Sequence, residues 1–171
     1  MISDPYRIEP LGKHHDRAAF SCGVEELNDY LQRFVGQDQR RNLARCFVLV
    51  NKNQPERILG YYTLSNAAVV QTGDAASPVR SPYPELPALL IGRLAVDKNL
   101  QGRGWGRLLL LFVLSHASRL SEDSGFALVL VGPIDERAAG FYARFGFRPL
   151  SSDRRMYLRL KDIRKTFTRT T

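Results

Sequence analysis

The sequence predicts a mixed α/β domain in which a central sheet is flanked by helices. Strand-type runs alternate with helix-type segments along the chain, an order typical of this class. The 171 residues, 44% hydrophobic and 25% charged, are enough to enclose one core and hardly two. We therefore expect a single domain over residues 1–171, with a frayed basic tail at 161–171.

The first half of the chain predicts one helix between a short strand and a hairpin. Residues 6–10 form a strand-type run that ends at a proline. After Gly23, apolar side chains recur at helical spacing as far as Gly36, which predicts a helix that ends there. Residues 46–50 and 58–70 are strand-type runs separated by a turn, and we expect them to pair as a hairpin.

The second half alternates strands and helices after a long loop. Residues 71–88 are rich in proline, and loops of this length in compact domains are often functional or mobile. Asp135 is a good N-cap for a helix that reaches Arg144. The other expected elements are a strand at 88–96, a buried helix at 108–120, a strand at 126–131, and closing strands at 147–150 and 156–160.

The charge of the chain favours a polyanionic partner. Lys and Arg number 25 against 17 Asp and Glu, a net charge of +8, and 20 of the 25 cations are Arg. The planar guanidinium fork suits phosphate better than the point charge of Lys. Such a surface favours nucleic acid, an acidic protein or a phosphorylated cofactor. A soluble protein that is merely basic is the alternative from charge alone.

Composition also excludes several classes. The longest apolar run, residues 108–114, is far shorter than the ~20 residues of a membrane-spanning helix, and we expect no signal peptide. Two cysteines make neither a disulfide framework nor a zinc quartet, and the expected compartment is the cytoplasm. His14 and His15 lack a Cys, His or Asp partner at ligand spacing, so we expect no metal.

A glycine-rich turn lies between a predicted strand and a predicted buried helix. Gln101 opens it, and glycines follow at positions 102, 104 and 106. Glycines let backbone amides converge at a helix start, where they bind phosphate oxygens, and Arg103 and Arg107 add charge. The spacing matches neither the Rossmann nor the Walker glycine pattern. The alternative is a tight turn whose glycines serve sterics only.

Two segments resemble the GNAT superfamily of N-acetyltransferases. Its acetyl-CoA signature, Gln/Arg-x-x-Gly-x-Gly/Ala after a strand, is similar to Leu94-Ala95-Val96 followed by Gln101-Gly102-Arg103-Gly104-Trp105-Gly106. Its Ala-x-x-Phe-Tyr-x-x-x-Gly-Phe segment is similar to residues 138–147. The resemblance implies an acetyl-CoA-dependent enzyme whose mostly antiparallel mixed sheet is splayed at the acetyl-CoA site. The residues implied to bind acetyl-CoA are 94–96 and 101–106.

A further set of residues resembles the GNAT toxins of bacterial toxin–antitoxin pairs. The set consists of His14, Phe20, Cys22-Gly23, Leu27-Asn28, Leu31, Gly60-Tyr61-Tyr62, Leu64 and Gly92-Arg93-Leu94-Ala95-Val96-Asp97. Trp105 departs from this branch, which usually has a smaller aliphatic residue there. The resemblance implies acetylation of the α-amino group of aminoacyl-tRNA, which blocks translation. It also implies a ribbon-helix-helix antitoxin and a homodimer.

Tyr142 is the candidate general acid for the thiolate that leaves acetyl-CoA. A phenol with a pKa near ~10 is protonated at neutral pH. Its helical spacing relative to Phe141 and Phe145 alone favours core packing, and the resemblance assigns it the catalytic role. No Asp or Glu stands out as a base. An α-amino group with a pKa near ~7.7–8.0 is partly neutral without one.

Arg93, Arg40 and Arg41 are the candidate contacts to an RNA acceptor arm. Arg93 lies on the strand that carries the signature, and the other two follow the first predicted helix. A solvated basic face is the alternative for each. Two other functions stay open for the chain: a GNAT enzyme acting on a small amine or a protein N-terminus, and a non-catalytic domain that binds acetyl-CoA or nucleic acid.

Overall fold

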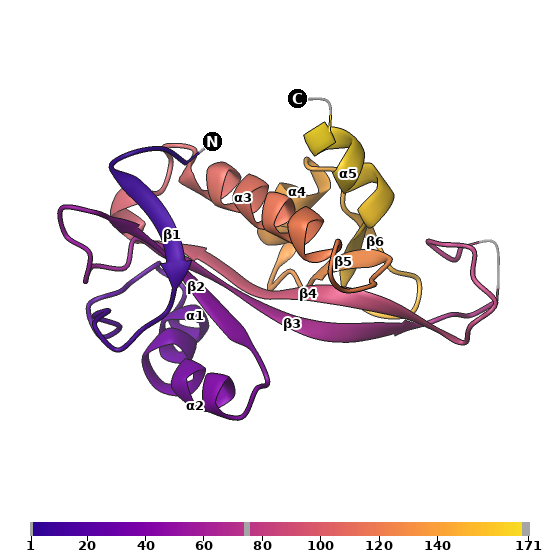
Figure 1. The fold of residues 1–171 in the computed structure, drawn as a ribbon, viewed down its shortest axis with the longest axis horizontal. Helices are drawn as coiled ribbons and strands as arrows, with labels where there is room; N and C mark the ends of the chain where they lie inside the picture. The colour runs from indigo at the N-terminus through magenta and orange to yellow at the C-terminus, as the bar shows by residue number, and fades with distance from the viewer. Residues whose placement is uncertain (1, 74–75, 169–171) are drawn as a thin grey trace. The chain divides into compact units, whose positions relative to one another are not determined.

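The computed structural model describes residues 2–73 and 76–168. Its strands form a seven-stranded sheet in the order β1-β2-β3-β4-β5-β7-β6 (Figure 1). The sheet is mixed, because β4 and β5 run parallel while β1–β2, β2–β3, β5–β7 and β6–β7 pair antiparallel. The predicted mixed α/β class is therefore confirmed. The three longest elements are β3 (Gly60–Val70), β4 (Glu85–Val96) and α3 (Trp105–Leu120).

The backbone divides into two compact units. Unit 1 consists of Met1–Ser65 and Gly92–Val113, and unit 2 of Asn66–Ile91 and Leu114–Thr171. β3, β4 and α3 each run from one unit into the other. The expectation of one domain over residues 1–171 stays a prediction. In the described part of the chain, no helix is long and apolar enough to cross a membrane.

Unit 1 is built on the pairing of β1 (Tyr6–Pro10) with β2 (Arg45–Asn51) and of β2 with β3. The boundaries of β1 match the prediction, and the expected hairpin of β2 and β3 is present. The helical segment that follows Gly23 lies on one side of β2, and α3 begins on the other (Figure 1). The core of unit 1 contains the fully buried side chains of Leu31, Val48 and Tyr61.

The helical segment of unit 1 continues past the predicted end at Gly36. It consists of α1 (Glu25–Asp29), a π-helical turn η1 (Tyr30–Phe34) and α2 (Val35–Arg40). Gly36 has no positive φ, so nothing in its backbone ends the helix. The residue that does so is Asn42, whose φ of 59° is the left-handed conformation typical after a helix C-terminus.

Unit 2 holds β5 (Leu128–Val131), which pairs with the first half of β4 and with β7 (Met156–Arg159). β7 also pairs with the two-residue strand β6 (Arg148–Pro149). Helix α4 spans Glu136–Ala143, and the predicted N-cap is confirmed because the Asp135 carboxylate accepts the Ala138 N–H at 2.8 Å. A one-turn helix, η2 (Lys98–Leu100), belongs to unit 1.

Two expectations for the second half were wrong. β4 begins at Glu85, three residues earlier than predicted, so the loop is shorter than 71–88. The predicted frayed tail forms helix α5 (Leu160–Thr168) instead, because Leu160 and Ile163 are buried on one side of it and the Arg164 guanidinium donates to the Ser121 carbonyl at 3.1 Å. Residues 169–171 of that tail lie outside the described part.

Candidate functional site

The glycine-rich turn after β4 has a backbone conformation that favours glycine at two positions. Gly102 and Gly104 have φ values of 77° and 83°, a region that side-chain-bearing residues rarely adopt. A Cβ on either residue would meet nothing within 4 Å, so the need for glycine is conformational and the space beside the turn is open. Alternating backbone handedness of this kind turns amides toward one concave surface.

Gln101 fixes this turn to the rest of unit 1. Its side-chain Nε2 donates hydrogen bonds to two backbone carbonyls, that of Cys22 at 2.6 Å and that of Val96 at 2.9 Å. The first carbonyl lies before α1 and the second at the end of β4. A second tie runs from the Lys98 N–H to the Ser21 carbonyl at 2.8 Å. A side-chain donor at position 101 therefore joins three segments that meet at the turn.

Helix α3 begins directly after the turn. Its first hydrogen bond runs from the Leu108 N–H to the Gly104 carbonyl at 3.1 Å, so the N–H groups of residues 105–107 precede that bond and are open to a ligand. Arg103 and Arg107 are exposed. The Trp105 indole packs edge-on against Tyr6, with ring centroids 4.6 Å apart. The arrangement can bind a pyrophosphate by amide donors, the helix dipole and two cations.

The other predicted acetyl-CoA residues form the end of β4. Pairing of β4 with β5 covers Ala88–Ile91, whereas β4 continues to Val96. Residues 94–96 lie beyond that pairing, and Ala95 and Val96 are buried. A strand whose pairing stops in this way has backbone donors and acceptors with which an extended ligand can pair.

Tyr142 lies in unit 2, on α4. Its side chain is buried, and its ring contacts Phe141 and Phe147 with centroids 5.3 and 5.6 Å apart. The hydroxyl makes no hydrogen bond within residues 2–73 and 76–168, although no fully buried side-chain oxygen there lacks a partner; the oxygen therefore reaches solvent. Burial raises the pKa of Tyr142 to about 12. The phenol consequently keeps its proton at neutral pH and is free to donate it to a ligand.

Arg93 stacks on an aromatic ring in unit 1. Its Cζ lies 3.5 Å from the centroid of the Tyr30 ring, and the Tyr30 hydroxyl donates to the Asp38 carboxylate at 2.8 Å. Burial and the bond to Asp38 raise the pKa of Tyr30, so the platform stays neutral. No carboxylate of the described residues pairs with the Arg93 guanidinium. Its N–H donors are held in place and available to an anion.

Arg40 meets a second guanidinium that the sequence analysis missed. A Cβ on Gly36 would lie 3.2 Å from Nη1 of Arg17 and 3.3 Å from Nη1 of Arg40, so both cations cover the same point of α2. Neither has a hydrogen-bonded or ionic side-chain partner among the described residues. Arg41, by contrast, follows α2 as its C-cap and donates its N–H to the Gln37 carbonyl at 3.0 Å. Two adjacent unpaired cations favour a bound polyanion.

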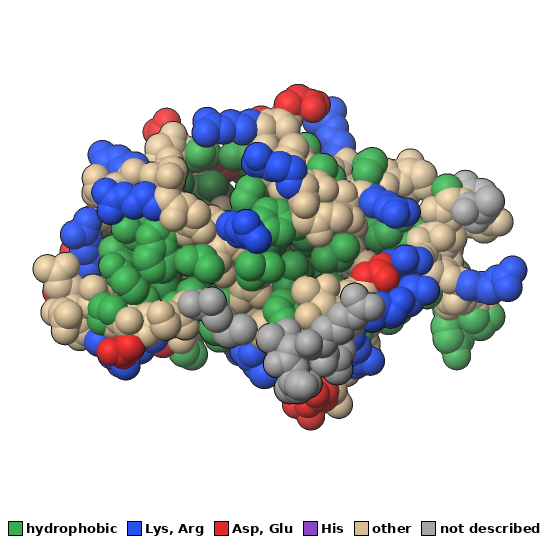
Figure 2. Space-filling model, turned by 90° about the horizontal axis from the view of Figure 1, so that it is seen from above, with side chains coloured by type: hydrophobic (Ala, Val, Ile, Leu, Met, Phe, Trp, Pro, Cys, Tyr) green, Lys and Arg blue, Asp and Glu red, His purple; other side chains and the backbone are tan. Residues whose placement is uncertain are grey.

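Basic side chains are also widespread on the face drawn in Figure 2, where acidic ones are few. The signal for Arg17 in the sequence was weak, because it lies in a loop without periodicity. Only the approach of that loop to a glycine on α2 brings it beside Arg40.

His14 and His15 have a carboxylate partner, contrary to the expectation from their spacing. Glu9, on β1, lies 2.7 Å from Nε2 of His15 and 3.5 Å from Nε2 of His14. The Gly12 N–H donates to Nδ1 of His15 at 2.9 Å, so the proton of a neutral His15 resides on Nε2 and is donated to Glu9. That nitrogen then has no lone pair for a metal ion. The three side chains are therefore better suited to holding β1 against the loop that follows it than to binding a metal ion.

The charge of Glu9 follows from the same contacts. Burial raises the pKa of Glu9, but hydrogen bonds from His15 and His14 and the charge of Arg7 outweigh burial and hold the pKa below its usual range. The carboxylate is therefore ionised at neutral pH and accepts bonds from the loop that carries Arg17.

The fold and the turn match a known family. The model of the acetyltransferase (GNAT) domain matches residues 42–149, more than half of the chain. The chain therefore belongs to the GNAT acetyltransferases, enzymes that use acetyl-CoA as the acetyl donor.

The chain is similar to tRNA-acetylating and probable toxins over nearly its whole length. The chain is 32% identical over 164 residues to a tRNA-acetylating toxin of Mycobacterium tuberculosis, covering 95% of each chain. It is 27% identical to a probable toxin TacT of Sinorhizobium fredii, covering 92% of each. The solved complex of AtaTR with acetyl-CoA is 29% identical, with a TM-score of 0.85 over 96% of this chain and 99% of that one. AtaT complexed with acetyl-methionyl-tRNAfMet is 30% identical, with a TM-score of 0.84 over 95% and 99%.

Replacing Gly104 by glutamate should abolish acetyl-CoA binding. The side chain would occupy the open space beside the turn with a negative charge, and the φ of 83° would be strained for any L-residue. Isothermal titration calorimetry with CoA checks this. Gly125→Ala is the matched control, because a Cβ there meets nothing within 4 Å and no positive φ is involved. Unchanged CoA affinity in a folded Gly104→Glu protein would remove the turn from the binding site.

Proposed function

We propose that this chain is a toxin that transfers the acetyl group of acetyl-CoA to the α-amino group of aminoacyl-tRNA and so blocks translation. The observation that carries the proposal is the coexistence in unit 1 of an acetyl-CoA-type turn and of three guanidinium groups without acidic partners, those of Arg17, Arg40 and Arg93. A GNAT enzyme for a small cationic amine needs acidic groups to attract its substrate. Unpaired guanidinium groups attract a phosphate backbone instead.

Acetyl-CoA binds through the turn and the end of β4 in this proposal. The amides around residues 102–107 hold the pyrophosphate, with Arg103 and Arg107 neutralising its charge. The pantetheine arm pairs with the backbone of residues 94–96 as an added strand would. A backbone N–H of this strand polarises the thioester carbonyl and stabilises the oxyanion that forms there. Holding the thioester in place beside the amine supplies much of the acceleration.

The amine of an aminoacyl ester attacks without a dedicated base. Its pKa starts from ~7.7–8.0, against ~10.4 for a lysine side chain, so part of it is neutral at physiological pH. The nitrogen adds to the thioester carbonyl, and the C–S bond breaks as the carbonyl re-forms. The nitrogen loses one proton to solvent and the sulfur gains one, so the products are the N-acetyl ester and CoA thiol.

Tyr142 donates the proton to sulfur in this scheme. Its hydroxyl has no competing acceptor in the described residues, and its raised pKa keeps it protonated at any physiological pH. A phenol with a pKa of about 12 is a weaker acid than an ordinary thiol, whose pKa is ~8.5. Transfer of the phenol proton to the departing thiolate is therefore uphill, and the return of a proton from solvent to the phenolate completes the step.

The proposal includes two protein partners. A mutant of the AtaT toxin has been solved bound to the C-terminus of the antitoxin AtaR. A basic chain with uncompensated guanidinium groups is suited to an inhibitor that supplies acidic groups. We propose a ribbon-helix-helix antitoxin as that inhibitor and a homodimer as the active form. Because charged tRNA is consumed by ribosomes, the proposed place of action is the cytoplasm.

The Tyr142→Phe variant should lose acetyl transfer while keeping its fold and its acetyl-CoA affinity. The ring and its contacts remain, but the proton is gone, and turnover should fall by roughly 10²–10⁴-fold. The assay follows labelled acetyl from acetyl-CoA to charged tRNA, with uncharged tRNA as the blank. Tyr83→Phe, on a side chain that is 70% exposed, is the matched control and should transfer at the wild-type rate. Transfer by Tyr142→Phe at the wild-type rate would return Tyr142 to a packing role.

The pH profile of transfer should show one rising limb and no fall below about pH 10. The rise reflects deprotonation of the α-amino group near ~7.7–8.0. Burial shifts the pKa of Tyr142 upward to about 12, so loss of the acidic proton belongs at higher pH still. Initial rates over short incubations, which limit ester hydrolysis, check this. A falling limb between pH 8 and 10 in the wild type that Tyr142→Phe lacks would contradict it.

Arg17→Gln and Arg40→Gln should each weaken tRNA binding across tRNA species. Each removes one guanidinium from the pair above Gly36, and each lost phosphate contact should lower the slope of log affinity against log salt by about one. Fluorescence anisotropy with labelled tRNA at several salt concentrations measures both effects. Arg57→Gln is the control, because Arg57, like Arg40, is exposed and has no side-chain partner in the described part. Slopes equal to that of Arg57→Gln would exclude the pair from the RNA interface.

A further inference from the structure

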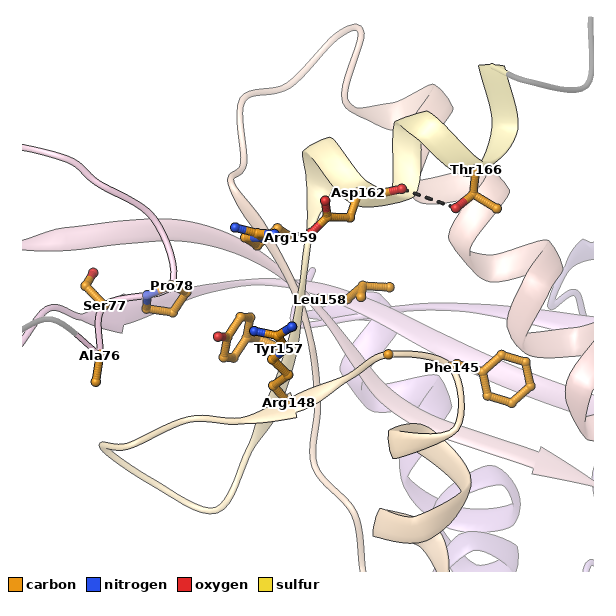
Figure 3. A pocket seen from close by; sticks show the side chains of 11 residues that line it. Ala76, Ser77, Pro78, Phe145, Arg148, Tyr157, Leu158, Arg159, Asp162 and Thr166 are labelled. Atoms are coloured by element: carbon orange, nitrogen blue, oxygen red, sulfur yellow. Dashed lines mark hydrogen bonds and ion pairs between the residues drawn. The ribbon is translucent and has the colours of Figure 1, made fainter.

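Unit 2 contains a cavity of about 570 Å³ to which the acetyl-transfer scheme assigns no role (Figure 3). Five parts of the chain line it: the turn after α4, the strands β6 and β7, helix α5, and the start of the segment that follows residue 75. Its polar and aromatic lining includes Arg148, Tyr157, Arg159 and Asp162, with Ser77 and Pro78 on the opposite wall.

Three of these side chains form a row on one face of the sheet. Arg148 on β6 and Tyr157 on β7 are direct cross-strand partners, so their side chains lie next to each other (Figure 3). Arg159 lies two residues beyond Tyr157, which places it on the same face. The row therefore reads guanidinium, aromatic ring, guanidinium, and all three line the cavity.

One cation of the row is paired with a carboxylate and the other is not. Nε of Arg159 donates to the Asp162 carboxylate at 2.7 Å, which positions that guanidinium and offsets its charge. Arg148 is exposed and has no side-chain partner in the described ranges. The cavity therefore has one uncompensated positive charge, beside an aromatic ring that is only half-buried. Asp162 also keeps one carboxylate oxygen free to accept a hydrogen bond.

This combination fits a nucleotide better than it fits other ligands. An apolar ligand would leave the Arg148 charge without an anionic partner, and a simple anion would make no use of the aromatic ring. A nucleotide in RNA has one negative charge on its phosphodiester, a flat base that stacks on aromatic rings, and amino groups that donate to a carboxylate. One free cation, one ring and one acceptor match these three features.

We propose that the cavity, here the Arg148–Tyr157 pocket, binds one unpaired nucleotide of the RNA substrate, with the phosphate on Arg148 and the base on Tyr157. Only an unstacked base exposes its face to such a ring, so the nucleotide belongs to a single-stranded part of the RNA. The chain itself indicates which part. Phe147, directly before Arg148, packs against Tyr142 with ring centroids 5.6 Å apart. The single-stranded 3′ end that carries the amino acid is therefore the segment bound. This inference rests on the proposed function.

The test compares two RNAs on the full-length protein. One is a labelled acceptor-stem hairpin with a single-stranded 3′ tail, and the other is the same hairpin with a blunt end. Neither is charged with an amino acid, so binding is measured apart from acetyl transfer. Fluorescence anisotropy gives the affinities of wild type, Arg148→Gln, Tyr157→Leu and Tyr157→Phe. Arg154→Gln removes an exposed cation from the neighbouring loop that does not line the cavity, and it is the matched control.

Wild type should bind the tailed hairpin more tightly than the blunt one. Arg148→Gln and Tyr157→Leu should each weaken binding of the tailed hairpin by roughly 5- to 100-fold, the range for loss of stacking or of a phosphate contact. Both should leave blunt-hairpin binding close to that of Arg154→Gln. Tyr157→Phe, which keeps the ring, should bind the tailed hairpin like wild type, and this result guards against a fold defect in the leucine variant.

Two outcomes would overturn the proposal, and they are distinguishable. If wild type binds the tailed hairpin and all four variants bind it equally well, the pocket is not the tail site, and the proposed function stands. If wild type binds neither hairpin, the proposed function fails and the pocket proposal fails with it. A further arm adds cytidine or adenosine monophosphate as competitor. Displacement of the tail only at millimolar concentration supports a chain-linked nucleotide, whereas displacement at the Kd of the hairpin assigns the pocket to free nucleotides.

Discussion

The two hydrogen bonds of the Gln101 side chain are the constraint on which the acetyl-CoA half of the site depends. They join the carbonyls of Cys22 and Val96, which belong to segments far apart in sequence. The glycines after Gln101 are conformationally free, and freedom of this kind costs entropy when a ligand must order it. Anchoring the turn at its first residue removes part of that cost before acetyl-CoA arrives. The amides at the start of α3 are then held in place for a phosphate.

The second constraint is the placement of charge, because a guanidinium that no carboxylate compensates can bind another anion. Arg155 is paired with Asp153 and Arg159 with Asp162, whereas Arg17, Arg40, Arg93 and Arg148 have no acidic partner in the part of the chain described. Arg93 is positioned by the Tyr30 ring beneath it. Cations that no carboxylate compensates favour a partner that carries many negative charges and is bound largely independently of its sequence. The phosphate backbone of RNA meets that description.

Several features of the fold and of the candidate site could be predicted from the sequence, because their sequence signals are local. The strand at Tyr6–Pro10, the N-cap at Asp135 and the glycine turn each depend on a few adjacent residues. The features that the sequence did not predict depend on contacts that no regular helix or strand spacing indicates. Gly36 was expected to end a helix, yet its role is to let Arg17 and Arg40 lie close to α2, and Arg17 comes from another segment. Glu9 was not recognised as the partner of His14 and His15, because separations of five and six residues match no regular helix or strand spacing.

In the proposed reaction, the acetyl group of acetyl-CoA ends on the α-amino nitrogen of an amino acid esterified to tRNA. Mass spectrometry of the products measures this most directly. Charged tRNA is incubated with the protein and acetyl-CoA and then digested to its terminal aminoacyl-adenosine. We expect this fragment to gain the mass of one acetyl group, and further fragmentation to place that group on the α-amino nitrogen. An unmodified aminoacyl-adenosine, or an acetyl group found on the nucleotides of the tRNA, would contradict the account.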